Sequence, residues 1–235
     1  MAALEDAAPE GPISPTARLT YFAGWGLAEQ TRWMLAAAGI EFAQVALASH
    51  AEFEALRSSG ALLFNQLPLL EIDGLCLTQS QAMVRYVARR AGLDAAASPA
   101  DAAQVDMLCE GVRDARGVVV GFAFAPDRAA FRADAPARLA KQMPCFEHAL
   151  ADGGFAIAGR ELTAADVLIA ELVEGAIPIV PAEFWAAYPK VVALHQRVVA
   201  VPSIRTYLDS DRRYPFPDGD VGVAYVANVN AVLGR

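Results

Sequence analysis

The sequence is poor in cysteine, which narrows the possible architectures. Its three cysteines, Cys76, Cys109 and Cys145, stand far apart in a chain of 235 residues. An odd number of isolated cysteines without a C-x-x-C pair gives neither a disulfide framework nor the spacing of a metal site, so we expect no metal cofactor. Because free cysteine is among the residues most often buried, we expect all three to be buried thiols.

Long apolar runs and an excess of positive charge are missing as well. The composition is 55% hydrophobic, yet charges interrupt every stretch of about 18 residues that could form a transmembrane helix. The first twelve residues carry acids and prolines in place of the basic start and apolar core of a signal peptide, which predicts a flexible tail over residues 1–17 of a cytoplasmic protein. A formal net charge of -8 without long single-sign blocks argues against nucleic acid or an anionic membrane as the main partner, although a small anionic ligand can still find a locally positive site.

The first part of the chain alternates strand-like and helix-like segments. Residues 18–23 and 41–47 read as strands that flank a helix over 28–38, which predicts a parallel pair with a right-handed crossover. After a short helix near 50–60, Asp73-Gly74 between two apolar segments predicts an antiparallel hairpin. A helix with one apolar face follows from Ser80 to Gly92. These elements predict an α/β domain with a mixed four-stranded sheet over residues 18–95.

The character of the sequence changes near residue 96. Ser98 and Pro99 form a helix start signal, and the remainder is rich in helical patterns without a convincing strand pair. Thr163 and Asp166 fit a capping box at the start of another helix. We therefore expect an α-helical domain over residues 96–235, in which the tail after Arg213 breaks the helix and forms at most a last helical turn or two.

Pro68 occupies an unusual position at the entrance of the apolar run L-P-L-L-E-I-D-G. Proline has no N–H to give to a sheet ladder, so it belongs at a strand's first residue, an edge or a bulge. This position leaves the preceding backbone free to bind something other than a neighbouring strand.

Two segments together resemble a known family. The pattern Y-F-x-G-x-G-x-A-E-x-T-R-W begins at Tyr21, and Q-L-P-L-L-E-I-D-G-x-x-L-T-Q-S begins at Gln66. They resemble the cytosolic glutathione transferases, especially the tyrosine-type alpha, sigma and mu classes. The resemblance implies a thioredoxin-like N-terminal domain, glutathione as co-substrate, a homodimer, and conjugation of the glutathione thiolate to a hydrophobic electrophile.

The resemblance also assigns residues to the binding of glutathione. It implies that the Leu67-Pro68 bond is cis and that Leu67 pairs with the cysteinyl backbone like an added strand, with Gln66 close by. It places the γ-glutamyl carboxylate at Gln79 and Ser80, where free N–H groups and the helix dipole favour an anion. From the sequence alone, Ser80 can equally be a plain N-cap.

Arg57 would face the glycyl carboxylate, although an isolated arginine is more often a solvated surface charge.

Tyr21 is the implied catalytic residue, whose phenol would donate a hydrogen bond to the sulfur. The pKa of a free thiol is roughly 8.5, and it must fall by about two units for the thiol to be mostly thiolate at pH 7. Leu27 stands where alpha and sigma enzymes commonly have an arginine and a mu-like pattern has leucine, which leaves open how far this pKa falls. Trp25 is either a wall of the electrophile pocket or an anchor of its loop.

Two further residues are implied at a dimer interface. Asp106 would reach across the dimer to the glutathione amino group, and Phe64 would insert into the partner subunit.

The alternatives to a conjugating transferase are a glutathione-dependent isomerase or peroxidase on the same fold, or a non-catalytic carrier or structural member of the family.

Overall fold

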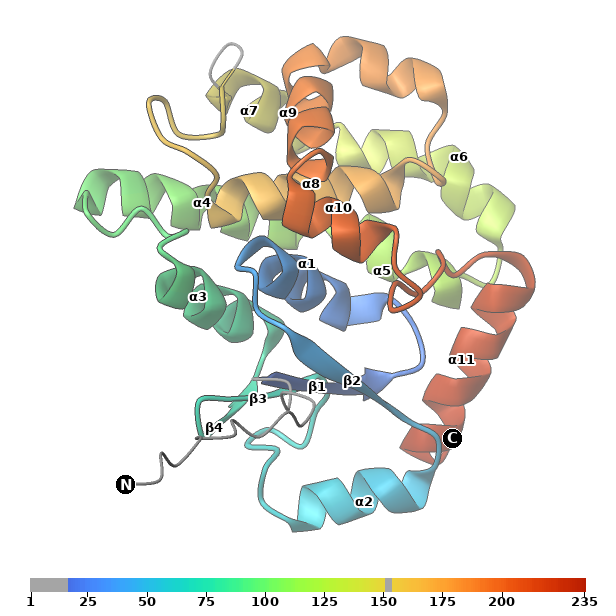
Figure 1. The fold of residues 1–235 in the computed structure, drawn as a ribbon. Helices are drawn as coiled ribbons and strands as arrows, with labels where there is room; N and C mark the ends of the chain where they lie inside the picture. Colours follow the sequence, from blue (N-terminus) through green and yellow to red (C-terminus); the bar gives the residue numbers. More distant parts are fainter. Residues whose placement is uncertain (1–16, 151–153) are drawn as a thin grey trace, which may run out of the picture.

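The computed structural model describes residues 17–150 and 154–235, and the predicted tail lies outside this range except for Ala17. Figure 1 shows a sheet in the lower half of the molecule, a group of helices above it, and α11 running down one side. Within the described residues, no helix is both long enough and apolar enough to cross a bilayer.

The sheet has the mixed topology that the sequence predicts, with strand order β2-β1-β3-β4. β1 (Ala17–Phe22) pairs in parallel with β2 (Phe42–Leu47) and antiparallel with β3 (Leu69–Ile72). The hairpin to β4 (Leu75–Thr78) turns at Asp73 and Gly74, whose φ angles of 51° and 77° are those that a tight two-residue turn requires. The fold class is confirmed for this part of the chain.

Three helices accompany the sheet, and their ends follow local sequence signals. A short 3-10 helix, η1 (Gly26–Ala28), leads into α1 (Glu29–Ala37), which crosses from β1 to β2. α2 (His50–Ser58) begins with a capping box of Ser49 and Glu52 that we did not identify in the sequence. α3 (Ser80–Ala91) ends at Gly92, which adopts the left-handed conformation with a φ of 71°.

The rest of the described chain is helical, as predicted. The helices are α4 (Pro99–Ala115), α5 (Gly117–Val120), α6 (Arg128–Leu139), α7 (Met143–Ala149), α8 (Ala164–Ala176), α9 (Pro189–Val199), α10 (Pro202–Leu208) and α11 (Gly219–Leu233), with 3-10 helices at Phe122–Phe124 and Ala182–Ala187. The predicted start signals are confirmed: Ser98 caps α4, and the Asp166 carboxylate accepts from the Thr163 N–H at 2.7 Å.

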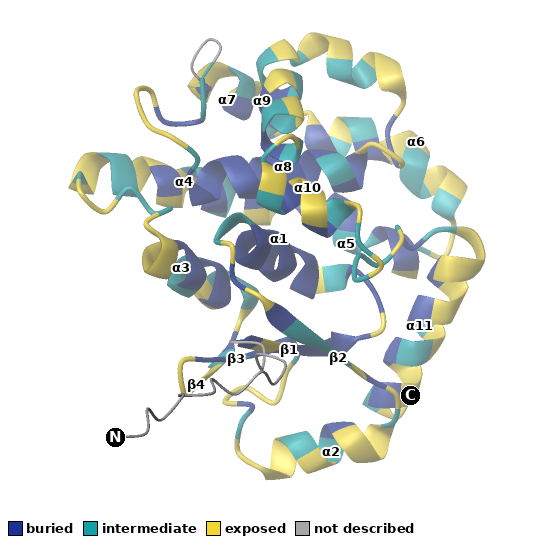
Figure 2. Ribbon diagram, in the orientation of Figure 1, coloured by how far each residue is buried: buried dark blue, intermediate teal, exposed yellow. Residues whose placement is uncertain are grey.

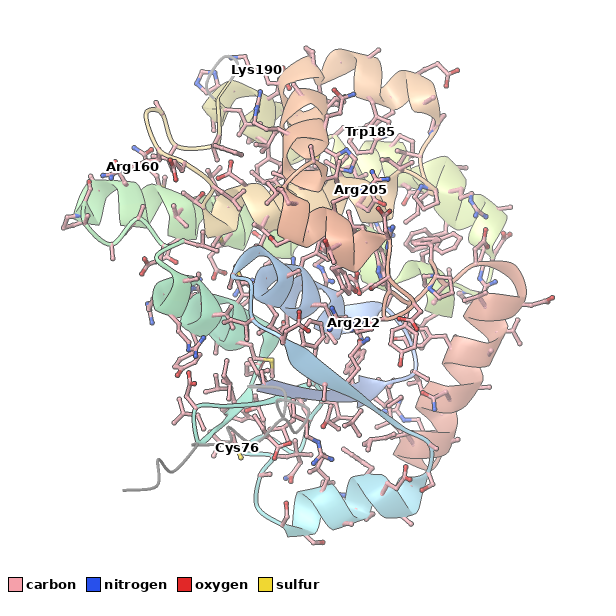
Figure 3. The ribbon with its side chains drawn as sticks, in the orientation of Figure 1. Cys76, Arg160, Trp185, Lys190, Arg205 and Arg212 are labelled. Carbon is pink, nitrogen blue, oxygen red and sulfur yellow. The ribbon has the colours of Figure 1, made fainter. Side chains whose placement is uncertain are left out.

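The two parts pack together through α1 and α8, which are both almost fully buried in Figure 2. α1 lies between the sheet and the helices, so even Glu29 and Arg32 on it are shielded from solvent. The link between α10 and α11 also returns to the sheet: the Arg212 carbonyl accepts from Gln44 Nε2 on β2 at 2.6 Å, and Figure 3 shows Arg212 near this strand. The edge of the sheet is therefore held by distant parts of the chain.

Two expectations from the sequence are wrong. α11 has 15 residues where we expected a turn or two, because its valine-rich sequence forms a weak helix by itself and is stabilised by packing of Tyr225, Val229 and Val232. Only Cys109 is a buried thiol, while Cys76 and Cys145 are exposed. Cys76 lies on β4, the last strand in the order of the sheet, and its side chain is exposed (Figure 3).

Candidate active site

The register of the sheet brings three of the predicted site segments to one end. Thr20 of β1 pairs with Leu69 of β3, and Leu69 pairs with Thr78 of β4. The next position in the same direction is Tyr21 after β1 residue Thr20, Pro68 before Leu69, and Gln79 after Thr78. The candidate catalytic tyrosine, the proline segment and the start of α3 therefore meet at one edge, although 58 residues separate the first from the last.

Tyr21 is the last residue but one of β1. The residue is 4% exposed, and its ring packs edge-to-face on Phe22 at a centroid distance of 4.8 Å. Its hydroxyl oxygen accepts a hydrogen bond from the Leu27 N–H at 3.0 Å. A phenol has one proton and two acceptor sites, so this bond leaves the proton of Tyr21 available to another acceptor. The geometry suits a phenol that donates to a sulfur atom.

Two buried arginines hold the loop that supplies this N–H. Arg32 Nη1 on α1 donates to the Trp25 carbonyl at 3.1 Å, and Arg116 Nη2 on the helical side donates to the Gly26 carbonyl at 2.9 Å. Because a buried charge needs a partner, each arginine is paired within the protein. The loop after β1 is thereby fixed from both domains.

The partners of these arginines are two buried glutamates. Arg32 pairs with Glu29 at 2.9 Å, and Arg116 pairs with Glu171 of α8 at 2.7 Å. Burial raises the pKa of the Glu29 carboxyl, although the charge of Arg32 opposes the shift. The i,i+3 spacing of Glu29 and Arg32 could have revealed the first pair in the sequence. No sequence signal could have revealed the second, because 55 residues separate its members.

The segment around Pro68 has the backbone that the resemblance implies. The Leu67-Pro68 peptide bond is cis, and Gln79 adopts a positive φ of 70°. The Gln79 side chain donates from Nε2 to Gln66 Oε1 at 3.3 Å, which joins two of the predicted binding residues.

Ser80 is the first helical residue of α3, whereas Gln79 occupies the N-cap position without a capping side chain. The plain N-cap role that the sequence allowed for Ser80 is therefore wrong. Because no side chain caps the first turn, its N–H groups remain suited to a carboxylate, and the helix dipole favours an anion there.

Trp25 and Arg57 lie in different surroundings. The Trp25 indole is 3% exposed, packs edge-to-face on Phe216 at 5.5 Å, and faces Gly175 of α8, where even a methyl group would collide with the ring. This favours its role as a loop anchor, and contact with an acceptor stays a prediction.

Arg57 lies at the end of α2, half-exposed and paired with Glu54. No described contact joins Arg57 to the other site residues.

The two residues expected at a dimer interface lie on the surface of the described chain. Asp106 on α4 accepts from Arg85 Nε of α3 at 3.1 Å. Phe64 is 56% exposed, beside Leu63 at 76%, and α4 presents Met107 at 68%. Exposed apolar side chains of this size favour a protein interface on these segments.

Comparison with known proteins identifies the family of both parts of the chain. Residues 17–89 match the glutathione S-transferase N-terminal domain, and residues 114–211 match the glutathione S-transferase C-terminal domain. The chain is 34% identical over 221 residues to glutathione S-transferase alpha-4 of Rattus norvegicus, which covers 92% of this chain and 97% of the relative. It is 32% identical over 222 residues to glutathione S-transferase 3 of Gallus gallus, covering 92% and 93% of the two chains.

Solved structures of similar proteins have the same architecture. The glutathione S-transferase from Ascaris lumbricoides superimposes with a TM-score of 0.69 at 29% identity and covers 83% of this chain and 96% of its own. Na-GST-3 from Necator americanus, described as monomeric, superimposes with a TM-score of 0.70 at 28% identity, over 83% and 97% of the two chains. The chain therefore belongs to the cytosolic glutathione transferase family and combines a thioredoxin-like domain with an α-helical domain in an enzyme with glutathione transferase function.

Proposed function

We propose that this enzyme conjugates the glutathione thiolate to hydrophobic electrophiles, with Tyr21 as the residue that stabilises the thiolate. The observation that carries the proposal is the hydrogen bonding of the Tyr21 hydroxyl group. Its oxygen accepts from the Leu27 N–H, so its proton is free to be donated to the sulfur. A hydrogen bond to a charged acceptor is worth about 1.5 to 3 kcal/mol, or about one to two pKa units of the bound thiol.

The remaining glutathione contacts follow from the edge of the sheet. The Leu67 backbone would pair with the cysteinyl residue, since the pairing of β3 with β1 ends at Leu69 and Leu67 lies beyond it. The N–H groups at Gln79 and Ser80 would bind the γ-glutamyl carboxylate, because the start of α3 has no capping side chain. Gln66 is held beside Gln79 and would contact the peptide between them.

The acceptor would bind between the loop after β1 and the helical domain. Trp25 contributes to this side of the site mainly by anchoring the loop against α8. Arg57 would bind the glycyl carboxylate, which requires the guanidinium to exchange Glu54 for the ligand. Such a salt bridge at a half-exposed position is weak, so the exchange costs little. Conjugation of this kind suits detoxification in the cytoplasm.

A homodimer completes the proposed site. Phe64 would insert into the partner subunit, and Asp106 would approach the glutathione amino group bound there. The exposed apolar side chains of Leu63, Phe64 and Met107 support this assembly. The similarity to a monomeric hookworm enzyme makes the oligomeric state a necessary measurement.

The test is activity of the purified protein with glutathione against aryl halides, enals, hydroperoxides and isomerisable ketones. Conjugation of halides or enals supports the proposal. Activity confined to hydroperoxides or ketones would identify a peroxidase or isomerase instead. Binding of glutathione without formation of a thiolate or any turnover would indicate a carrier or structural protein.

A further inference from the structure

The C-terminal helix brings a second phenol to the catalytic tyrosine. Tyr225 of α11 lies 204 residues after Tyr21 in the chain, yet it is 4% exposed and packed into the same loop. Its ring lies so close to Gly24 that a Cβ at that residue would stand 2.2 Å from a ring carbon. The glycine is therefore required for the approach of this ring to the end of β1.

The two hydroxyl groups converge on one point. A Cβ placed on Gly26 would stand 2.3 Å from the Tyr225 hydroxyl oxygen and 2.6 Å from the Tyr21 hydroxyl oxygen. Any side chain at residue 26 would displace both oxygens, and its φ of 48° also favours glycine. The loop thus leaves space in which two phenols face each other.

Hydrogen bonds fix the face of α11 that carries Tyr225. Asn228, one turn later, accepts from the Ala23 N–H at 2.8 Å and donates to the Leu47 carbonyl at 2.9 Å. The Val232 carbonyl, one further turn along, contacts His50 Nδ1 at 3.0 Å. Residues 225, 228 and 232 share one face of a helix, so these bonds hold the phenol in register with the ends of β1 and β2.

We propose that Tyr225 is a positioning residue that donates its hydroxyl proton to the Tyr21 oxygen. With the Leu27 N–H already bound to this oxygen, both acceptor sites of Tyr21 are then filled, and its single proton can only point outward to the glutathione sulfur. Donors on the phenol oxygen also polarise its O–H bond, which strengthens the bond that Tyr21 donates. This inference rests on the proposed role of Tyr21.

The electrostatic surroundings keep Tyr225 in its protonated, donating form. Burial raises the pKa of the Tyr225 phenol, and the charge and hydrogen bonding of Tyr21 raise it further. Arg32 of α1 and Arg116, which follows α4, act in the opposite direction but do not outweigh burial. Tyr225 therefore remains a donor across the working range of the enzyme.

The test measures the pKa of bound glutathione by thiolate absorbance in the wild type, Tyr225→Phe, Tyr21→Phe and the double variant. Loss of one polarising bond should raise the thiol dissociation pKa in Tyr225→Phe by about 0.3 to 0.6 units, a two- to fourfold change. The affinity for glutathione should stay within a factor of two, because the ring is retained. In the Tyr21→Phe background the second substitution should have no effect, since its acceptor has gone.

Tyr86→Phe is the matched control, because it removes a phenol hydroxyl that donates to Asp73 at 2.7 Å away from this site. A pKa in Tyr225→Phe equal to that of the wild type would overturn the inference. An equal shift in both backgrounds would also overturn it, because Tyr225 would then act on the sulfur directly. A wild type that binds glutathione without any thiolate band would instead contradict the proposed function itself.

Discussion

The N–H of Leu27 donates a hydrogen bond of 3.0 Å to the hydroxyl oxygen of Tyr21. The backbone of residue 27 thus takes part in the site while its side chain, 42% exposed, does not fix the geometry. The absence of an arginine at this position removes a charge but leaves the orienting bond intact. Thiolate stabilisation and positioning can therefore be tested separately.

Tyr21→Phe should raise the pKa of the bound thiol by about one to two units, because it removes the bond to sulfur and keeps the packing on Phe22. Turnover near neutral pH should fall about 10- to 100-fold and partly recover as the pH is raised. Thiolate absorbance and turnover against pH measure both effects. Superimposable curves for variant and wild type would remove Tyr21 from the mechanism.

Leu27→Arg should have the opposite effect on the same pKa. A cation beside the sulfur stabilises the thiolate, and at this partly exposed position the gain should be about half a unit to one unit. The gain should shrink in high salt, because exposed charges are screened. Leu27→Gln supplies a long polar side chain without the charge and should leave the pKa unchanged. An equal shift in both variants would show that charge is not the cause.

Substitutions in the buried pair of Arg116 and Glu171 should affect stability and activity separately. Arg116→Met leaves Glu171 buried without its partner and should lower the free energy of unfolding by about 3 to 5 kcal/mol. Adding Glu171→Leu should restore most of this stability. Turnover of the double variant should remain low, because the Gly26 carbonyl has lost its donor.

Urea unfolding and turnover measure the two effects. Arg113→Met, in the last turn of α4 just before Arg116, is the control, since its pair with Glu110 is on the surface and should contribute at most about 1 kcal/mol. A double variant as unstable as the single one would show that the charge of Glu171 is not what destabilises the protein. Full activity in the stable double variant would exclude a role of Arg116 in holding the loop.

The sequence predicts those parts of the molecule that depend on neighbours in the chain. The turn at Asp73-Gly74 and the capping box at Thr163 are set within a few residues, and both are confirmed. The buried pair of Arg116 with Glu171 and the approach of Tyr225 to Tyr21 depend on packing between distant helices. The length of α11 was underestimated for the same reason, because docking rather than helix propensity stabilises it.

Phe64→Ser should weaken the proposed dimer. An aromatic anchor in an interface is worth about 2 kcal/mol or more, so the dissociation constant should rise at least about 30-fold. Light scattering and sedimentation at micromolar concentration measure the change. Val223→Ser, at a 63% exposed position on the helix at the opposite side of Figure 1 from α3, should have no effect. A monomeric wild type would contradict the assembly, and with it the proposed reach of Asp106 into a partner's site.

Glu174 predicts how stability depends on pH. Its carboxylate accepts from Arg213 Nη2 at 2.6 Å and contacts His195 Nε2 at 2.8 Å, which joins α8, α9 and the segment before α11. The hydrogen bond with His195, followed by that with Arg213, lowers the pKa of the Glu174 carboxyl to about 2 against the opposing effect of burial. A lowered pKa in the folded state stabilises the fold fully above the ordinary value of 4.5, and this contribution is lost as the pH falls through about 2.

Glu174→Gln should therefore lower the free energy of unfolding by about 1 to 3 kcal/mol at pH 7, since a unit of pKa corresponds to about 1.4 kcal/mol and the side chain retains some contact with water. The difference between the variant and the wild type should stay constant from pH 7 to about 5 and should narrow below pH 4.5, because the carboxyl group of the unfolded wild-type chain takes up its proton there while the folded state stays ionised down to about 2. Urea unfolding at a series of pH values measures this difference. Glu183→Gln, at an exposed carboxylate on the segment between α8 and α9, should give a difference near zero throughout. If the Glu174→Gln difference does not change between pH 7 and pH 3, the loss of stability comes from packing, and the charge of this carboxylate does not link α8 to its neighbours.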